Sequence, residues 1–218
     1  MKTLGIHHEG WKFFFIFSVA FALIYLLYPP ISYAVLVLCF YTLYFFRDPE
    51  RVAPKQENAV ISPADGVICQ IKSAQAPPEV GFSGSKNCTK VSVFMNVFNV
   101  HVNRSPIKGD VIHQQYIPGA FFNASLDKAS EHNERNALRI VHESGKEVGL
   151  VQIAGLIARR IVQWIPEDKK LSSGERFGLI RFGSRVDLYL PTDTVLKVKI
   201  GQKVTAGETI IATLQGNE

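Results

Sequence analysis

The sequence predicts a mainly β domain preceded by an α-helical hairpin that associates with a membrane. The run from Phe13 to Phe46 contains no Asp, Glu, Lys, Arg or His, although hydrophobic residues make up only 47% of the 218-residue chain. The rest consists of short β-type runs separated by Gly, Pro and Asn, a texture typical of barrels and sandwiches. We therefore expect a membrane hairpin over residues 1–46 and a β-rich domain over residues 47–218.

Pro29-Pro30 divides the apolar run into two halves. One helix across the whole run would be about 50 Å long, and the prolines would break it. We therefore expect two helices, Phe13–Tyr28 and Ile31–Phe46. Each would be roughly 24 Å long, slightly less than a hydrocarbon core of about 30 Å, so the hairpin either just spans the bilayer or dips in and returns.

Positive charges flank the outer ends of this hairpin, and its turn carries none. The basic residues are Lys2, Lys12, Arg47 and Arg51. Because Lys and Arg accumulate on the cytoplasmic side, we expect both ends on the cytoplasmic face of the cell (inner) membrane. A cleaved signal peptide is the alternative, but the run is too long and lacks a convincing small-residue cleavage site before its second half.

The β-type runs recur at short intervals along the second region. The predicted strands are Val67–Ile71, Lys90–Val97, Asp110–Tyr116, Ala137–His142, Glu147–Ile153, Phe177–Phe182, Arg185–Leu190, Val195–Ile200 and Thr209–Leu214. Only Asn123–Asn136 and Leu156–Trp164 have the length and composition of a helix or helical turn.

The C-terminal stretch Val195–Leu214 favours a particular β architecture. With its Gly turns before each strand, it resembles half of a barrel-sandwich hybrid related to biotinyl and lipoyl domains, and Ser62–Ile68 resembles the entry strand of the other half. A carrier domain of that type needs an exposed Lys at a hairpin tip, usually beside Met, and that signature is absent from the sequence. The pattern therefore predicts a barrel-sandwich-hybrid-like fold without the swinging-arm function.

Composition argues against several classes of partner. The net charge of +5 is scattered, which suits an anionic membrane surface better than a nucleic acid. The three cysteines have no C-x-x-C spacing, so we expect a reducing compartment and neither a disulfide framework nor a zinc ribbon. The histidines lack metal-ligand spacing, and there is no Walker sequence or GxGxxG, so we expect no metal and no nucleotide.

Three polar positions are candidates for chemistry. Gly183-Ser184 lies between two strand-like runs, where a plain turn is the alternative interpretation. Asp65 precedes a Gly, and Asp-Gly is itself a standard turn former. Alternation places His101 on the same face as Asn99 and Asn103, where a hydrogen-bonded strand histidine is the alternative.

These positions fall within motifs that resemble those of phosphatidylserine decarboxylases, in the same order. The motifs are Ser62-Pro-Ala-Asp-Gly66, Phe94–Pro106 with His101, Lys128–Asn136, and Phe182-Gly-Ser-Arg185. The chain resembles the short bacterial and archaeal type of this family over nearly its whole length, including Phe45–Glu50 at the exit from the hairpin.

The resemblance implies an inactive proenzyme that cuts its own Gly183–Ser184 bond. The Ser184 hydroxyl would attack the Gly183 carbonyl, with His101 as the base and Asp65 orienting its imidazole. Elimination and hydrolysis would leave a covalent pyruvoyl group at position 184. The products would be a large β chain, 1–183, and a small α chain, 184–218, whose further oligomerisation the sequence leaves open.

The pyruvoyl group is the cofactor that the resemblance implies, and phosphatidylserine in the membrane is the substrate. The ketone would form a Schiff base with the substrate amine and act as an electron sink while carbon dioxide leaves, giving phosphatidylethanolamine. His101 is the nearest implied proton donor, but longer family members commonly carry a further His three positions earlier, where this chain has Phe98. The decarboxylation acid therefore stays open.

The substrate phosphate and carboxylate would attract cations. Those available, each expected to be a solvated surface charge, are Lys128, Arg135, Arg139, Arg159, Arg160 and Arg185. Two other functional classes are possible. A membrane-anchored adaptor predicts a stable uncut chain, and a barrel-type metallopeptidase predicts bound zinc and a second imidazole ligand.

Overall fold

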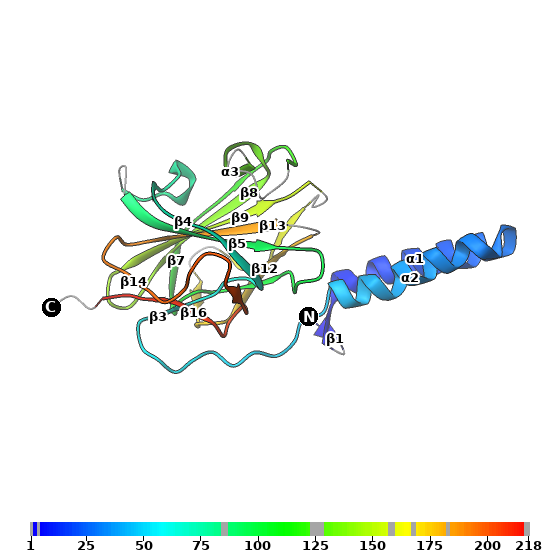
Figure 1. The fold of residues 1–218 in the computed structure, drawn as a ribbon, viewed down its shortest axis with the longest axis horizontal. Coiled ribbons are helices and arrows are strands. Elements are labelled where there is room, and N and C mark those ends of the chain that lie inside the picture. Colours follow the sequence, from blue (N-terminus) through cyan, green and yellow to red (C-terminus); the bar gives the residue numbers. More distant parts are fainter. Residues whose placement is uncertain are drawn as a thin grey trace. The chain divides into compact units, whose positions relative to one another are not determined.

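Two long helices lead into a series of β-strands in the computed structural model of the protein (Figure 1). It describes residues 2–3, 5–83, 87–122, 129–156, 160–166, 169–181 and 184–215. The chain divides into two compact units, Met1–Glu50 and Arg51–Glu218.

The first unit is a helical hairpin, as predicted. Helix α1 (His8–Leu27) and helix α2 (Pro29–Phe45) are separated by Tyr28 alone. The two prolines are the first residues of α2 rather than a linker before it, because the first turn of a helix does not need their missing N–H groups. Helix α1 begins earlier than predicted, since the His7 side chain accepts a hydrogen bond from the Glu9 N–H at 3.4 Å and caps the helix.

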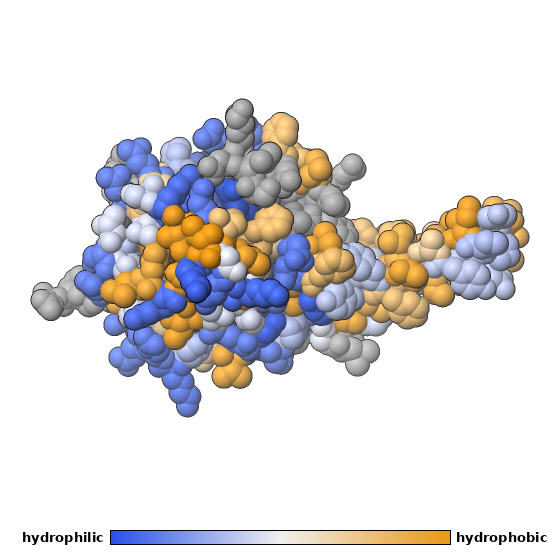
Figure 2. All heavy atoms as spheres, viewed as in Figure 1, coloured by the Kyte–Doolittle hydropathy of each residue, from blue (hydrophilic) through white to orange (hydrophobic). Residues whose placement is uncertain are grey.

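The surface of this hairpin is mostly apolar, with weakly polar residues towards its tip (Figure 2). Helix α1 has 20 residues, is long and apolar enough to cross a membrane, and ends in Leu27, which is 85% exposed. Helix α2 is a shorter apolar helix of 17 residues. At the base of the hairpin the Arg47 guanidinium lies 3.9 Å from the centre of the Tyr44 ring, a pairing suited to a membrane–water interface.

The second unit contains, among the described residues, one eight-stranded sheet and two three-stranded sheets, all antiparallel. The large sheet has the order β11-β7-β8-β9-β13-β5-β4-β15, and the small ones are β10-β12-β6 and β14-β16-β3. The short strands β1 (Lys2–Thr3) and β2 (Ile6–His7) belong to the first unit. The remaining bounds are β3 (Ala59–Ile61), β4 (Gly66–Gln75), β5 (Asn87–Met95), β6 (Val102–Arg104), β7 (Gly109–Ile117), β8 (Arg135–Val141), β9 (Glu147–Ala154), β10 (Ile161–Gln163), β11 (Lys170–Leu171), β12 (Arg176–Ile180), β13 (Ser184–Leu190), β14 (Val195–Leu196), β15 (Lys203–Val204) and β16 (Ile210–Thr213).

The large sheet curls like half of a barrel and is buried on both faces around β13 (Figure 1). On one face Val186 and Leu188 join the main hydrophobic core. On the other face Tyr189 joins a smaller cluster with Val80, which ends the short 3-10 helix η1 (Pro78–Val80). The predicted fold class, a mainly β barrel-like domain with an N-terminal helical hairpin, is confirmed.

Of the two helix predictions in the β domain, Asn123–Asn136 is borne out in part, as a helical turn, and Leu156–Trp164 is wrong where the structure describes it. From Asn123–Asn136 the described part contains only α3 (Ala129–His132), after which β8 begins at Arg135 to fill the place between β7 and β9. From Leu156–Trp164 the β-branched Ile161 and Val162 form β10 and pair with β12. Residues 123–128 and 157–159 lie outside the described residues.

Two predicted strands also end early. Residues 97–98 form a turn, so the alternation that placed Asn99 and His101 on one strand face is wrong, and β6 begins only at Val102. The Val195–Ile200 strand stops at Leu196, and Gly201, with φ of +84°, follows in a turn closed by the Gln202 N–H to the Lys199 carbonyl.

Gly66 is expected to tolerate no side chain, because a Cβ there would lie 2.1 Å from the Phe94 carbonyl oxygen on the paired strand. Gly66→Ala should lower the free energy of unfolding by about 3 kcal/mol, since two hydrogen-bonded strands would have to separate. Thermal unfolding of the full chain in detergent measures this. The control Gly145→Ala, with φ of +78° and open space around the new Cβ, should cost only about 1 kcal/mol. Equal losses in the two variants would contradict the prediction.

Candidate functional site

Ser184 is the first residue of β13 and is held between two strands. It pairs with Met95 of β5 on one side and with Ala154 of β9 on the other. The residue is 0% exposed, and its Oγ lies 4.0 Å from the Met95 sulfur. Ser184 therefore occupies a fixed position in a central strand, not a plain turn, whereas Gly183 lies outside the described residues.

His101 lies beside the strand that leads towards Ser184. Its carbonyl accepts a hydrogen bond from the Ile180 N–H at 3.3 Å, at the end of β12. Ile180 precedes Ser184 by four residues, which span at most about 14 Å. The backbone of His101 thus lies beside the end of β12, on the segment that precedes Ser184, and its side chain is 2% exposed; its role as the base for Ser184 stays a prediction.

The His101 ring is oriented by a backbone carbonyl. Its Nδ1 lies 2.9 Å from the Asn99 carbonyl oxygen. A carbonyl can only accept, so in the neutral ring Nδ1 carries the hydrogen and Nε2 carries the lone pair. This is the tautomer that a general base needs, and sequence reasoning missed Asn99 as the group that sets it.

The Asp65 carboxylate contacts the backbone of Ala206 and the side chain of Arg51. Its Oδ1 accepts a hydrogen bond from the Ala206 N–H at 2.7 Å, and its Oδ2 pairs with Arg51 Nη2 at 3.2 Å. Arg51 also contacts Glu208 at 3.3 Å. The role of Asp65 in orienting His101 stays a prediction. Arg51, which the sequence suggested only as a charge flanking the hairpin, contacts Asp65 here.

The segment around Asp65 nevertheless packs against the strand that follows His101. The Pro63 carbonyl accepts a hydrogen bond from the Arg104 N–H at 2.9 Å and from Asn103 Nδ2 at 3.4 Å. Both donors belong to β6, which begins directly after His101. Two of the sequence motifs therefore meet at β6.

A buried chain of amides supports this region. Gln152 Nε2 donates to Asn103 Oδ1 at 2.8 Å, and Asn136 Nδ2 donates to Gln152 Oε1 at 3.0 Å. Asn103 also lies 3.7 Å from the sulfur of Met95, the strand partner of Ser184. Such buried networks rigidify their surroundings, and Gln152, the one polar side chain between Val148 and Ala154, is the signal that could have revealed this one.

The end of the Lys128–Asn136 motif contacts β9, the strand that pairs with Ser184. Asn133 Nδ2 donates to the Ala154 carbonyl at 2.7 Å, and the Ala154 N–H donates to the Glu134 carbonyl at 2.9 Å. Glu134 also accepts a hydrogen bond from the Ile161 N–H at 2.8 Å. The polar residues of this motif thus hold the end of β9 beside Ser184.

The cations predicted to lie on the surface differ in their burial and in their ion pairs. Arg185 is 1% exposed and pairs with Asp187 at 2.9 Å, which also pairs with Lys90 at 2.9 Å, so the surface prediction is wrong for Arg185. Alternation along β13 turns its side chain away from the main core. Of the others, Arg160 is exposed, Arg135 pairs with Glu79 and Arg139 with Glu147, and Lys128 and Arg159 lie outside the described residues.

Asp187→Asn is expected to destabilise the protein by about 3 kcal/mol, because it removes the buried carboxylate that two buried cations contact. Chemical denaturation of the full chain measures this loss. Asp193→Asn is the matched control: Asp193 pairs with Lys146, but its side chain is 42% exposed, and its loss should cost less than about 1 kcal/mol. An equal decrease in the free energy of unfolding in both variants would show that the buried ion pairs of Asp187 stabilise the protein no more than an exposed pair does.

Comparison with known families agrees with this arrangement. The family model described as phosphatidylserine decarboxylase matches residues 39–212. The matched range runs from the second half of α2 to β16 and includes all four motifs.

Proposed function

Since the chain belongs to the phosphatidylserine decarboxylase family, a family of carboxy-lyases, we propose that it cuts its own Gly183–Ser184 bond and then decarboxylates phosphatidylserine with a pyruvoyl group made from Ser184. The observation that carries this proposal is the position of Ser184. It is a buried serine at the start of a central strand, and the carbonyl of His101 accepts a hydrogen bond from Ile180, four residues before it.

Self-cleavage would begin at the Ser184 hydroxyl. His101 Nε2 takes the hydroxyl proton while Oγ attacks the Gly183 carbonyl carbon, and the amide becomes an ester as the Ser184 nitrogen is released and protonated. Elimination then removes the Cα proton of residue 184 to a base and breaks the Cβ–Oγ bond, so that residue 183 leaves as a carboxylate and residue 184 becomes dehydroalanine. Hydrolysis releases ammonia and leaves the pyruvoyl group.

The residues around position 184 fit such a group. Hydrogen bonds to β5 and β9 hold β13 on both sides, so a cut before Ser184 leaves the new end in place. Position 184 is 0% exposed, with its Oγ 4.0 Å from the Met95 sulfur, so the group would be shielded from bulk solvent. When present, the pyruvoyl carbonyl condenses with the substrate amine and accepts electron density as carbon dioxide leaves. The same pairing would keep the 1–183 and 184–218 chains together.

The helical hairpin gives this enzyme access to a lipid substrate. Exposed apolar side chains on α1 and α2 suit a bilayer, and Lys12 and Arg47 lie near the outer ends of the two helices. We place the catalytic domain on the cytoplasmic face of the membrane on the basis of these charges.

The intact mass of the purified protein tests the proposal. We expect a fragment of residues 184–218 that is lighter by one ammonia than the peptide with an N-terminal serine, together with release of carbon dioxide from vesicles containing phosphatidylserine. A single 24.3 kDa species that does not turn over the lipid would contradict it and favour the adaptor.

A further inference from the structure

A pocket of about 310 Å³ lies on the face of the large sheet that is opposite the main core. Val151 and Ile153 of β9 and Tyr189 of β13 line it, and these side chains belong to the smaller hydrophobic cluster. The side chain of Ser184 is on the other face, in register with Met95 of the main core. The pocket is therefore separate from the candidate catalytic site.

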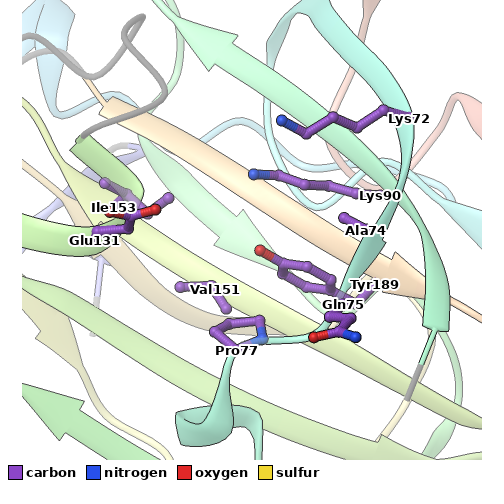
Figure 3. Close-up of a pocket in the computed structure, with 9 residues that line it drawn as sticks. All are labelled: Lys72, Ala74, Gln75, Pro77, Lys90, Glu131, Val151, Ile153 and Tyr189. Carbon is purple, nitrogen blue, oxygen red and sulfur yellow. The ribbon is translucent and has the colours of Figure 1, made fainter. Parts of the chain in front are cut away.

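Opposite charges are placed on different sides of this pocket. Lys72 of β4 and Lys90 of β5 run side by side with their ammonium groups turned the same way, and Glu131 of α3 lies across the pocket from them (Figure 3). Val151 lies between Glu131 and Tyr189 and gives the pocket an apolar surface (Figure 3).

One of the two cations, Lys90, is held in place by a buried ion pair. Lys90 is only 4% exposed, and Asp187 at 2.9 Å fixes its ammonium. An ammonium group has three donors, and Asp187 needs only one of them. The Tyr189 hydroxyl is a further donor, because burial, reinforced by the nearby Asp187, raises the pKa of Tyr189 and keeps the phenol protonated. Donors that are already oriented lose little entropy on binding.

We propose that this pocket binds a small zwitterion, with a phosphate group against Lys72, Lys90 and the Tyr189 hydroxyl and a primary ammonium group towards Glu131. Three donors lining the same pocket match the several acceptor oxygens of a phosphate, which lysines bind as point charges. The Glu131 carboxylate disfavours a bare anion and favours one that carries its own cation. A free phosphorylated amino alcohol and a lipid headgroup share this chemistry.

Calorimetric titration of the full-length Ser184→Ala protein in detergent tests this inference without depending on the proposed function. This variant carries no carbonyl that could condense with amines, and binding is measured without activity. We expect O-phosphoethanolamine to bind one to one and at least about tenfold more tightly than inorganic phosphate or ethanolamine, because only it engages both sides. If a short-chain phosphatidylethanolamine displaces O-phosphoethanolamine, the ligand of this pocket is a lipid headgroup. If it does not, the ligand is a free metabolite.

Further substitutions in the Ser184→Ala protein test whether the ligand binds in this pocket. Lys72→Met should weaken binding of O-phosphoethanolamine by roughly tenfold, the scale for one charge-assisted contact, and Glu131→Gln should remove its advantage over inorganic phosphate. Lys203→Met, which removes an exposed lysine outside the pocket, should change neither affinity. The inference is overturned by the absence of saturable binding, by phosphate binding as tightly as the zwitterion, or by equal affinities in the Lys72 and Lys203 variants.

Discussion

Ser184→Ala is expected to leave a single uncut chain that releases no carbon dioxide from phosphatidylserine. Without the hydroxyl no ester can form at Gly183, and without cleavage no pyruvoyl group can form at position 184. Activity should therefore fall by at least about a thousandfold, the scale for loss of a catalytic nucleophile. Intact mass and lipid turnover, measured on the same preparation, check the two parts of this expectation.

Ser92→Ala is the matched control for this experiment. Ser92 is also a fully buried serine, on the strand beside β13, and its hydroxyl has no hydrogen-bond partner among the described residues. It should be cut and should turn over lipid as the unsubstituted protein does. Cleavage of the Ser184 variant at the normal rate would show that the bond is broken by another nucleophile. An uncut but active variant would refute the pyruvoyl group.

Local pattern was sufficient to predict the hairpin but not the arrangement of the sheets. An uncharged run with two central prolines specifies two helices whatever surrounds it. The place of β8 between β7 and β9 depends on pairing with distant strands, and this pairing also takes in Arg135 and Asn136, the last two residues of the segment with helical composition. The burial of Arg185 has the same cause, since Asp187 and Lys90 meet it only through the register of β13 and β5.

The candidate site was predicted by the order of motifs, and its contacts were not. The strand pairing of Ser184 with Met95 and the approach of His101 to Ile180 are non-local, so no spacing in the sequence reveals them. The Asn99 carbonyl that orients His101 is a backbone group, to which residue types give no clue. Arg51 reaches Asp65 from a segment directly after the hairpin, which explains why it was assigned only to membrane topology.

His101→Gln is expected to slow self-cleavage by roughly a hundredfold or more, the usual contribution of a general base. Glutamine nearly fills the space of the imidazole and can still form hydrogen bonds, but it cannot take up the Ser184 proton. The measurement is the rate at which the 184–218 fragment appears by mass after synthesis. His142→Gln, at a histidine whose Nδ1 lies 2.9 Å from Ser144, is the control and should be cut normally.

The same variant separates the two roles proposed for His101. Where some cut chains accumulate, their turnover is expressed per pyruvoyl group rather than per total protein. If His101 also protonates the product, turnover per group falls as well, because Phe98 cannot donate a proton where longer relatives carry a histidine. Normal turnover per group would restrict His101 to self-cleavage and require another acid. Cleavage at the unsubstituted rate, in a variant that unfolds at the normal temperature, would instead remove His101 from the role of base.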